Sequence, residues 1–157
     1  MRKIRNRRIV LYMVALSLLL LGGRGTEIGS LRPVEVVQIY EKSGILFLKT
    51  DTGDMGWGLT VNQAVTKLKD TTPGVIYLDT ADYLLLGKDT ERYLLSMRRY
   101  LKNKTRMVYS PEDMDLEAAA GYLRIHCPSE TIGSGGKPME ILSNEGGKII
   151  LKKFKEK

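Results

Sequence analysis

The aspartates of this chain form the first group of side chains that could carry chemistry. Asp51-Thr52-Gly53 is the tripeptide of aspartic proteases, and Asp79-Thr80-Ala81 is a looser version of it. A protease of that class needs two carboxylates that share one proton across a symmetric site. The short stretch between the two motifs cannot hold two similar β-lobes, so the first motif is interpreted as a turn before a helix. Asp79 and Asp82, at a strand end, are the best candidates for an exported enzyme of unrecognised type.

Two further motifs point to chemistry only superficially. The segment 133–137 reads Gly-Ser-Gly-Gly-Lys, but Thr131 stands where a phosphate-binding loop needs its first Gly and Pro138 replaces the final Ser/Thr. His126 and Cys127 are the only His and Cys, and two ligands do not make a zinc site. Their side chains point apart as immediate neighbours, which disfavours Cys–His catalysis. The sequence therefore predicts no catalytic residue, no cofactor and no metal site.

A Gly-rich loop predicted over residues 51–58 contains the most distinctive contact residues. Met55, Gly56 and Trp57 stand together there, and Trp57 is the only tryptophan. A Trp and a Met flanked by Gly in a loop can be exposed residues through which a partner binds. In the alternative interpretation, Trp57 folds back onto the following helix and covers the core.

The elements that must position these residues follow from hydrophobic periodicity. Val34–Tyr40 and Ile45–Lys49 alternate as strands around a turn, which predicts a β-hairpin. Thr60 and Gln63 have capping-box spacing at the start of a helix over Thr60–Lys69. Its apolar positions recur at helical spacing and form one face: Val61, Ala64, Val65 and Leu68.

The remainder of the chain alternates between strands and helices. Asp113 or Asp115 is expected to cap the last helix. The other predicted segments are a strand at 75–78, which 83–86 continues or follows as another strand, a strand at 105–109, a helix at 89–101, a helix ending near 123, a Gly-rich linker at 131–138, and a hairpin at 139–154. This alternation predicts an α/β (α+β) fold, with a single small mixed sheet and about three amphipathic helices.

The net charge of +7 is concentrated at the two ends of the chain. Residues 1–25 carry six basic side chains and no acidic one, and residues 148–157 carry five Lys and one Glu. Residues 26–147 have more acidic than basic side chains, which argues against a nucleic-acid-binding face on the body. The Lys-rich C-terminus could contact anionic head groups or wall polymer, or it could protect an edge strand from aggregation.

The N-terminus has the layout of an export signal. Five basic residues precede an apolar run of 13 residues, Ile9–Leu21, interrupted only by Ser17. Positive charge stays on the cytoplasmic side, so the rest of the chain is expected outside. The run is short for a membrane span, which needs about 20 apolar residues. Two alternatives follow: a single-pass anchor that is retained, or a secreted product after cleavage near Gly25.

These features divide the chain into three predicted parts. They are a signal or anchor at 1–25, an extracytoplasmic α/β domain at 26–130, and a linker with a basic hairpin at 131–157. Cys127 cannot form an internal disulfide because no second cysteine exists. The absence of a Cys after the apolar run excludes a lipoprotein anchor, and the arrangement is typical of a bacterial envelope protein.

Residues 58–123 resemble the N-terminal domain of the Ger(x)C family, the C subunits of spore germinant receptors. The resemblance is carried by Gly58, the Thr60–Ala64–Leu68 pattern, the strand Tyr83–Leu86 ending at Gly87, the paired Arg98-Arg99, and the strand Arg106–Tyr109 before Leu116–Leu123. Family members are longer and carry a lipid-anchoring Cys that this chain lacks. The resemblance therefore implies a single-domain relative that acts by protein contacts in a spore-forming, Gram-positive bacterium.

The resulting prediction is a non-enzymatic, membrane-tethered extracytoplasmic binding or assembly domain with a role in sporulation or germination. Its expected partners are the membrane, through the N-terminal helix, and a membrane protein. The alternatives are an exported small-ligand-binding protein or an unrecognised enzyme. The sequence does not indicate an oligomeric state.

Overall fold

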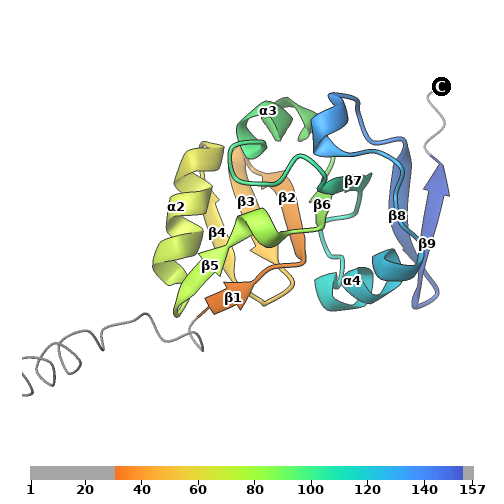
Figure 1. Cartoon of the computed structure of the whole chain (residues 1–157), viewed down its shortest axis with the longest axis horizontal. Coiled ribbons are helices and arrows are strands. Elements are labelled where there is room, and N and C mark those ends of the chain that lie inside the picture. The colour runs from red at the N-terminus through yellow and green to blue at the C-terminus, as the bar shows by residue number, and fades with distance from the viewer. Residues whose placement is uncertain (1–30, 154–157) are drawn as a thin grey trace, which may run out of the picture. The chain divides into compact units, whose positions relative to one another are not determined.

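The structure, a computed structural model, describes residues 31–153, which all lie in one unit of the chain (Figure 1). The signal or anchor predicted at residues 1–25 lies outside the described residues. The mixed α/β architecture is confirmed. The expectation of one small sheet is wrong, because the described residues form a seven-stranded sheet and a separate two-stranded sheet.

The large sheet is parallel in its centre and antiparallel at both ends. Its strand order is β4-β3-β2-β6-β7-β8-β9, with β2, β6, β7 and β8 parallel to one another. The strands are β2 (Val36–Lys42), β3 (Ile45–Thr50), β4 (Met55–Gly58), β6 (Tyr83–Leu86), β7 (Arg106–Tyr109), β8 (Glu140–Glu145) and β9 (Lys148–Lys153). The small parallel sheet pairs β1 (Leu31–Pro33) with β5 (Val75–Tyr77).

Local turn chemistry explains the antiparallel ends. Ser43 and Gly44 both have positive φ, 54° and 77°, as the tight turn between β2 and β3 requires. Gly53, with φ 84°, ends the turn between β3 and β4, where its N–H donates to the Thr50 carbonyl. The predicted β2–β3 hairpin and the predicted C-terminal hairpin of β8 and β9 are both confirmed.

Three α-helices pack on this sheet within the described part of the chain. They are α2 (Val61–Thr71), α3 (Leu94–Met97) and α4 (Leu116–Ile125). The connections also contain the 3₁₀ turns η2 (Leu78–Thr80), η3 (Glu91–Tyr93) and η4 (Ile132–Ser134). The Gln63 N–H donates to the Thr60 hydroxyl, and the Gln63 side chain accepts from the Leu59 N–H. The Asp115 carboxylate caps α4 by accepting from two backbone N–H groups.

The core lies on both faces of the sheet. One cluster packs α2 and Met97 of α3 against strand residues that include Ile39, Leu84 and Leu86. The other packs α4 against the opposite face, where Leu85 and Val108 point by strand alternation. Figure 1 shows α2 beside β4 and β3, and α4 towards the β8–β9 end of the sheet.

Two predicted irregular segments are ordered parts of this unit. The expected loop at residues 51–58 ends in strand β4, which pairs with β3 from Lys49–Met55 to Leu46–Gly58. The expected linker at 131–138 contains η4, whose Ile132 is 1% exposed and belongs to the core. Two loop hydrogen bonds fix η4, because the Ile132 N–H donates to Thr105 and the Gly133 N–H to Asn103.

The helix predicted over residues 89–101 is wrong in its length. The structure has only η3 followed by the single turn α3. Asp89 has φ 60°, outside the helical region, and the Thr90 hydroxyl donates to the Gly87 carbonyl instead of starting an α-helix. Met97 and Leu101 are nevertheless buried, as their apolar character predicts.

Candidate functional site

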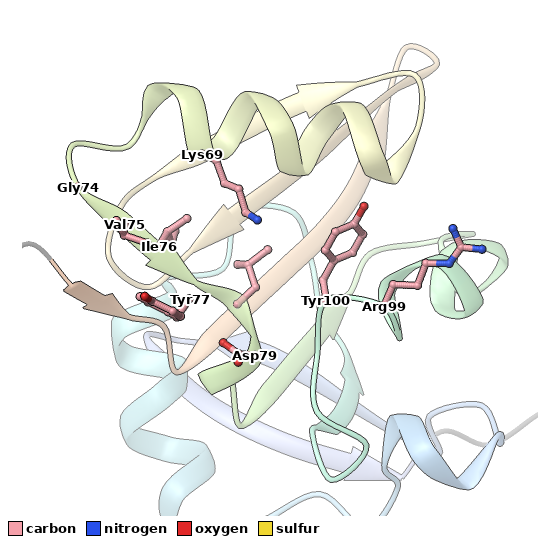
Figure 2. Close-up of a pocket in the computed structure, with 9 residues that line it drawn as sticks. Lys69, Gly74, Val75, Ile76, Tyr77, Asp79, Arg99 and Tyr100 are labelled. Carbon is pink, nitrogen blue, oxygen red and sulfur yellow. The ribbon is translucent and has the colours of Figure 1, made fainter. Parts of the chain in front are cut away.

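The aspartates singled out as enzyme candidates lie in different surroundings. Asp79 lines a cleft of about 520 Å³ between the end of α2 and β5. Figure 2 shows Lys69 pointing from α2 into this cleft, and Tyr100 and Arg99, which also line it, on the side across from β5. Asp82 is not among the lining residues, and its carboxylate accepts from the Lys102 ammonium at 2.5 Å. Asp79 is therefore the only carboxylate among the described residues that line the cleft.

Asp51 has a structural role in the turn that precedes β4. Both oxygens of its carboxylate lie 3.2 Å from the Glu35 backbone nitrogen, which donates to them. Burial raises the pKa of Asp51 above its ordinary value, although hydrogen bonds from backbone N–H groups, including that of Glu35, oppose the rise. This arrangement fits the turn predicted for the Asp51 motif.

His126 and Cys127 have separate contacts, as expected for adjacent side chains. The His126 ring stacks on Tyr122 with centroids 4.4 Å apart. The Cys127 sulfur lies 4.0 Å from the hydroxyl of Tyr83, which donates to the Leu123 carbonyl at 2.9 Å. Burial, then the contact with Cys127, raises the pKa of Tyr83 to about 12. Within residues 31–153, no group of three His, Cys, Asp or Glu side chains is placed to hold a metal ion.

Met55, Gly56 and Trp57 form most of the edge strand β4. Met55 is 40% exposed and Trp57 is 42% exposed. A Cβ on Gly56 would lie 2.1 Å from the Ala64 carbonyl oxygen, so Gly56 faces α2 and the two larger side chains point to the opposite face. The Lys67 ammonium lies 5.1 Å from the Trp57 ring centroid, in cation–π range.

Two further aromatic side chains extend this exposed face. Strand pairing places Tyr40 opposite Phe47, and Phe47 opposite Trp57, on one face of β2, β3 and β4. The Tyr40 and Phe47 rings stack with centroids 5.2 Å apart, and both residues are half-buried. The Tyr40 hydroxyl lies 3.9 Å from the Met55 sulfur. We call the four side chains Tyr40, Phe47, Met55 and Trp57 the aromatic face.

The backbone of β4 adds a second feature at this edge. The Thr50 N–H donates to the Asp54 carbonyl, so alternation along the antiparallel pair makes Trp57 a non-hydrogen-bonded position opposite Phe47. Its N–H and C=O consequently point away from β3. The same alternation turns the Met55 carbonyl outward, where it accepts from the Thr71 hydroxyl at 3.1 Å.

Sequence reasoning found part of this site. It selected Met55, Gly56 and Trp57, but it placed them in a loop and did not associate Tyr40 or Phe47 with them. The signal for the missing residues is the alternation in the first hairpin, which puts Tyr40 and Phe47 on the face opposite Ile39 and Leu48.

No family model matches the sequence, and no curated protein or solved structure shows significant similarity to it. Among the described residues, no helix combines the length and apolar character needed to cross a membrane.

Proposed function

We propose that this protein is a non-enzymatic, membrane-tethered extracytoplasmic domain that binds a protein partner through the aromatic face. The observation that carries the proposal is the exposure of Met55 and Trp57, at 40% and 42%, beside two stacked aromatic rings. Trp, Tyr and Met are enriched at protein interfaces, where a few large side chains supply most of the binding energy. Scattered exposed apolar residues are ordinary, but a contiguous group of this kind favours an interaction site.

The edge of β4 favours a particular mode of contact. The outward N–H and C=O of Trp57 offer one pair of backbone hydrogen bonds to an extended segment of the partner. The strand is only four residues long, so this pairing would be short. We infer that the aromatic face provides most of the affinity and that the strand edge fixes the direction of the bound segment.

The membrane tether rests on the N-terminal sequence. Five basic residues followed by the apolar run Ile9–Leu21 favour insertion with the domain outside the cytoplasm. A membrane-protein partner is consistent with this placement, because tethering confines both proteins to one surface and raises their effective concentration. The resemblance of residues 58–123 to the Ger(x)C domain supports a role in sporulation or germination.

The proposal is tested by photocrosslinking in the native cells with the full-length protein. A photoreactive amino acid replaces Met55, and the products are identified by mass spectrometry in the presence and absence of Trp57→Ala. We expect one dominant membrane-protein adduct that Trp57→Ala reduces at least tenfold, which corresponds to about 1.4 kcal/mol. Leu95→Ala is the matched control, because Leu95 is 75% exposed and lies outside the aromatic face.

The controls separate binding from folding and from localisation. Trp57→Ala should leave the melting temperature nearly unchanged, because its side chain is not part of either buried cluster. Equal loss of the adduct with Leu95→Ala, or a large loss of stability with Trp57→Ala, would contradict the assignment. Fractionation and the intact mass of the product show whether residues 1–25 are retained in the membrane.

A further inference from the structure

A second hollow lies at the carboxyl ends of β6 and β7, which β2 and β3 separate from Met55 and Trp57 on β4. It has a volume of about 560 Å³, within the range typical of small-molecule sites. Its walls are mainly apolar and include Leu86, Pro111, Ile141 and Leu142. Lys88, Asp89 and Glu91, which follow β6, also line it.

The topology of the sheet explains why a hollow forms here. After β6 the chain turns to the face that α3 covers, because Met97 packs in the same cluster as Leu84 and Leu86. After β7 it turns to the opposite face, where α4 packs on Leu85 and Val108. Adjacent parallel strands whose connections leave on opposite faces open a crevice at their carboxyl ends, which is where open α/β sheets bind ligands.

The wall formed by the β7–α4 connection is held in place by buried hydrogen bonds. Gln38 is fully buried, and its side-chain nitrogen donates to the Ser110 hydroxyl at 3.0 Å and to the Pro111 carbonyl at 2.6 Å. The Ser110 N–H donates to the Leu86 carbonyl at 2.9 Å. On the other side, the Thr90 hydroxyl holds the turn after β6. The hollow is therefore preformed, as small-molecule sites usually are.

The charged residues of the hollow favour a cation. Asp89 and Glu91 contribute two carboxylates against the single ammonium of Lys88. The Glu91 carboxylate is fixed by the Tyr109 hydroxyl, which donates to it at 2.7 Å. An adjoining cavity that shares Glu91 and Tyr109 adds one carboxylate and one ammonium, from Glu130 and Lys137, so the acidic excess persists.

We propose that this hollow binds a small organic cation with an apolar body about the size of one or two fused rings. The apolar body lies against Leu86, Pro111 and Ile141, and the positive charge lies near Asp89 and Glu91. The inference is independent of the aromatic face, so either proposal can fail without the other.

The test compares three probes of similar shape and different charge: tryptamine, indole and indole-3-acetate. The ¹⁵N-labelled full-length protein is kept in a mild detergent, and free probe concentrations are set by dialysis. Tryptamine should shift the amide signals of Leu86, Ser110 and Ser143 with a dissociation constant on the order of 1 mM. Indole-3-acetate should bind on the order of 25-fold more weakly than tryptamine, because an attraction worth roughly fivefold is lost and a repulsion of similar size replaces it. The amide of Asp70, on the exposed surface of α2, serves as a remote reference.

Two variants test the charge without disturbing the fold. Asp89→Asn keeps a residue type that tolerates φ 60°, and Glu91→Gln keeps an acceptor for Tyr109. Each variant should weaken the binding of tryptamine roughly fivefold and leave the binding of indole unchanged. Asp70→Asn, on the exposed surface of α2, is the matched control and should change the affinity for neither tryptamine nor indole.

A third variant tests the cavity itself. Ile141→Trp should fill the hollow and abolish the binding of all three probes while the spectrum stays dispersed. If this variant does not fold, the comparison of Asp89→Asn with Asp70→Asn still decides the charge assignment. The proposal is overturned if no probe gives saturable shifts at these amides up to about 5 mM, or if tryptamine and indole-3-acetate bind equally.

Discussion

Gly56→Ala should strongly destabilise the protein, because Gly56 is the point of closest approach between β4 and α2. A Cβ at this position would lie 2.1 Å from the Ala64 carbonyl oxygen, 2.5 Å from the Leu68 nitrogen and 2.6 Å from the Leu68 Cβ. Two of these three atoms belong to the helix backbone, so a side-chain rotation cannot relieve the contact. Either α2 moves away from the sheet or β4 leaves β3.

The magnitude follows from the cost of overpacking. One extra methyl group in a well-packed core costs about 1–3 kcal/mol, and contacts with an immovable backbone belong at the upper end. We expect Gly56→Ala to lower the free energy of unfolding by about 3 kcal/mol. Gly121→Ala is the matched control, because a Cβ there meets nothing within 4 Å inside α4. Alanine is a better helix former than glycine, so this variant should gain about 1 kcal/mol.

Urea unfolding of the full-length protein in mild detergent measures both variants. Trp57 is the only tryptophan and lies next to Gly56, so its fluorescence reports directly on this contact. Circular dichroism follows the rest of the domain. A free energy of unfolding for Gly56→Ala within about 0.5 kcal/mol of the unmodified protein would refute the packing of α2 on β4.

Two further predictions concern the cap of α2 and a buried tyrosine. Thr60→Ala should lower the free energy of unfolding by about 1 kcal/mol, because the Thr60 hydroxyl accepts a hydrogen bond from the Gln63 N–H. The same urea assay measures this loss. Thr66→Ala, in the middle of the helix, is the control. Tyr83 should ionise near pH 12, detected by tyrosinate absorbance and absent in Tyr83→Phe. The unfolded chain releases this proton near pH 10, so the folded protein holds more protons between these values and its stability should fall as pH rises from 10 to 12.

Each of these two predictions has a clear contrary outcome. Thr66→Ala should not lose stability, because alanine is the better helix former. An unchanged free energy of unfolding for Thr60→Ala would show that the cap hydrogen bond contributes nothing. Ionisation of every tyrosine near pH 10 would show that the Tyr83 hydroxyl is not held by the Leu123 carbonyl in a buried position.

Short-range sequence patterns were sufficient to predict the elements that depend mainly on their own residues and caps. The helix after Thr60 has its cap, its buried face at Val61, Ala64, Val65 and Leu68, and its end before Pro73 in the sequence itself. The cap of the last helix at Asp115 and the two hairpins follow from the same kind of short-range pattern. Strand order was not predictable in this way, because β2 pairs with β6 across more than 40 intervening residues.

The two misplaced segments have different causes: tertiary contacts order one of them, and local backbone geometry shortens the helix in the other. Residues 131–138 contain three glycines and read as a linker, yet Ile132 fills the core and backbone hydrogen bonds to Thr105 and Asn103 fix the segment. The helix predicted over 89–101 has the right apolar residues for its buried side. Its first turn fails because Asp89 adopts a left-handed conformation.

The position of the candidate contact residues is a consequence of how α2 packs. Gly56 and Gly58 alternate with Met55 and Trp57, and a Cβ at either glycine would collide with α2. Successive side chains of a strand point to opposite faces, so the packing that requires glycine on one face sends Met55 and Trp57 to the other. The sequence Met-Gly-Trp-Gly is therefore a strand pattern, with the smallest residue on the helix side and large apolar residues on the exposed side. The same constraint links stability to binding, because a substitution that displaces β4 must also displace the aromatic face.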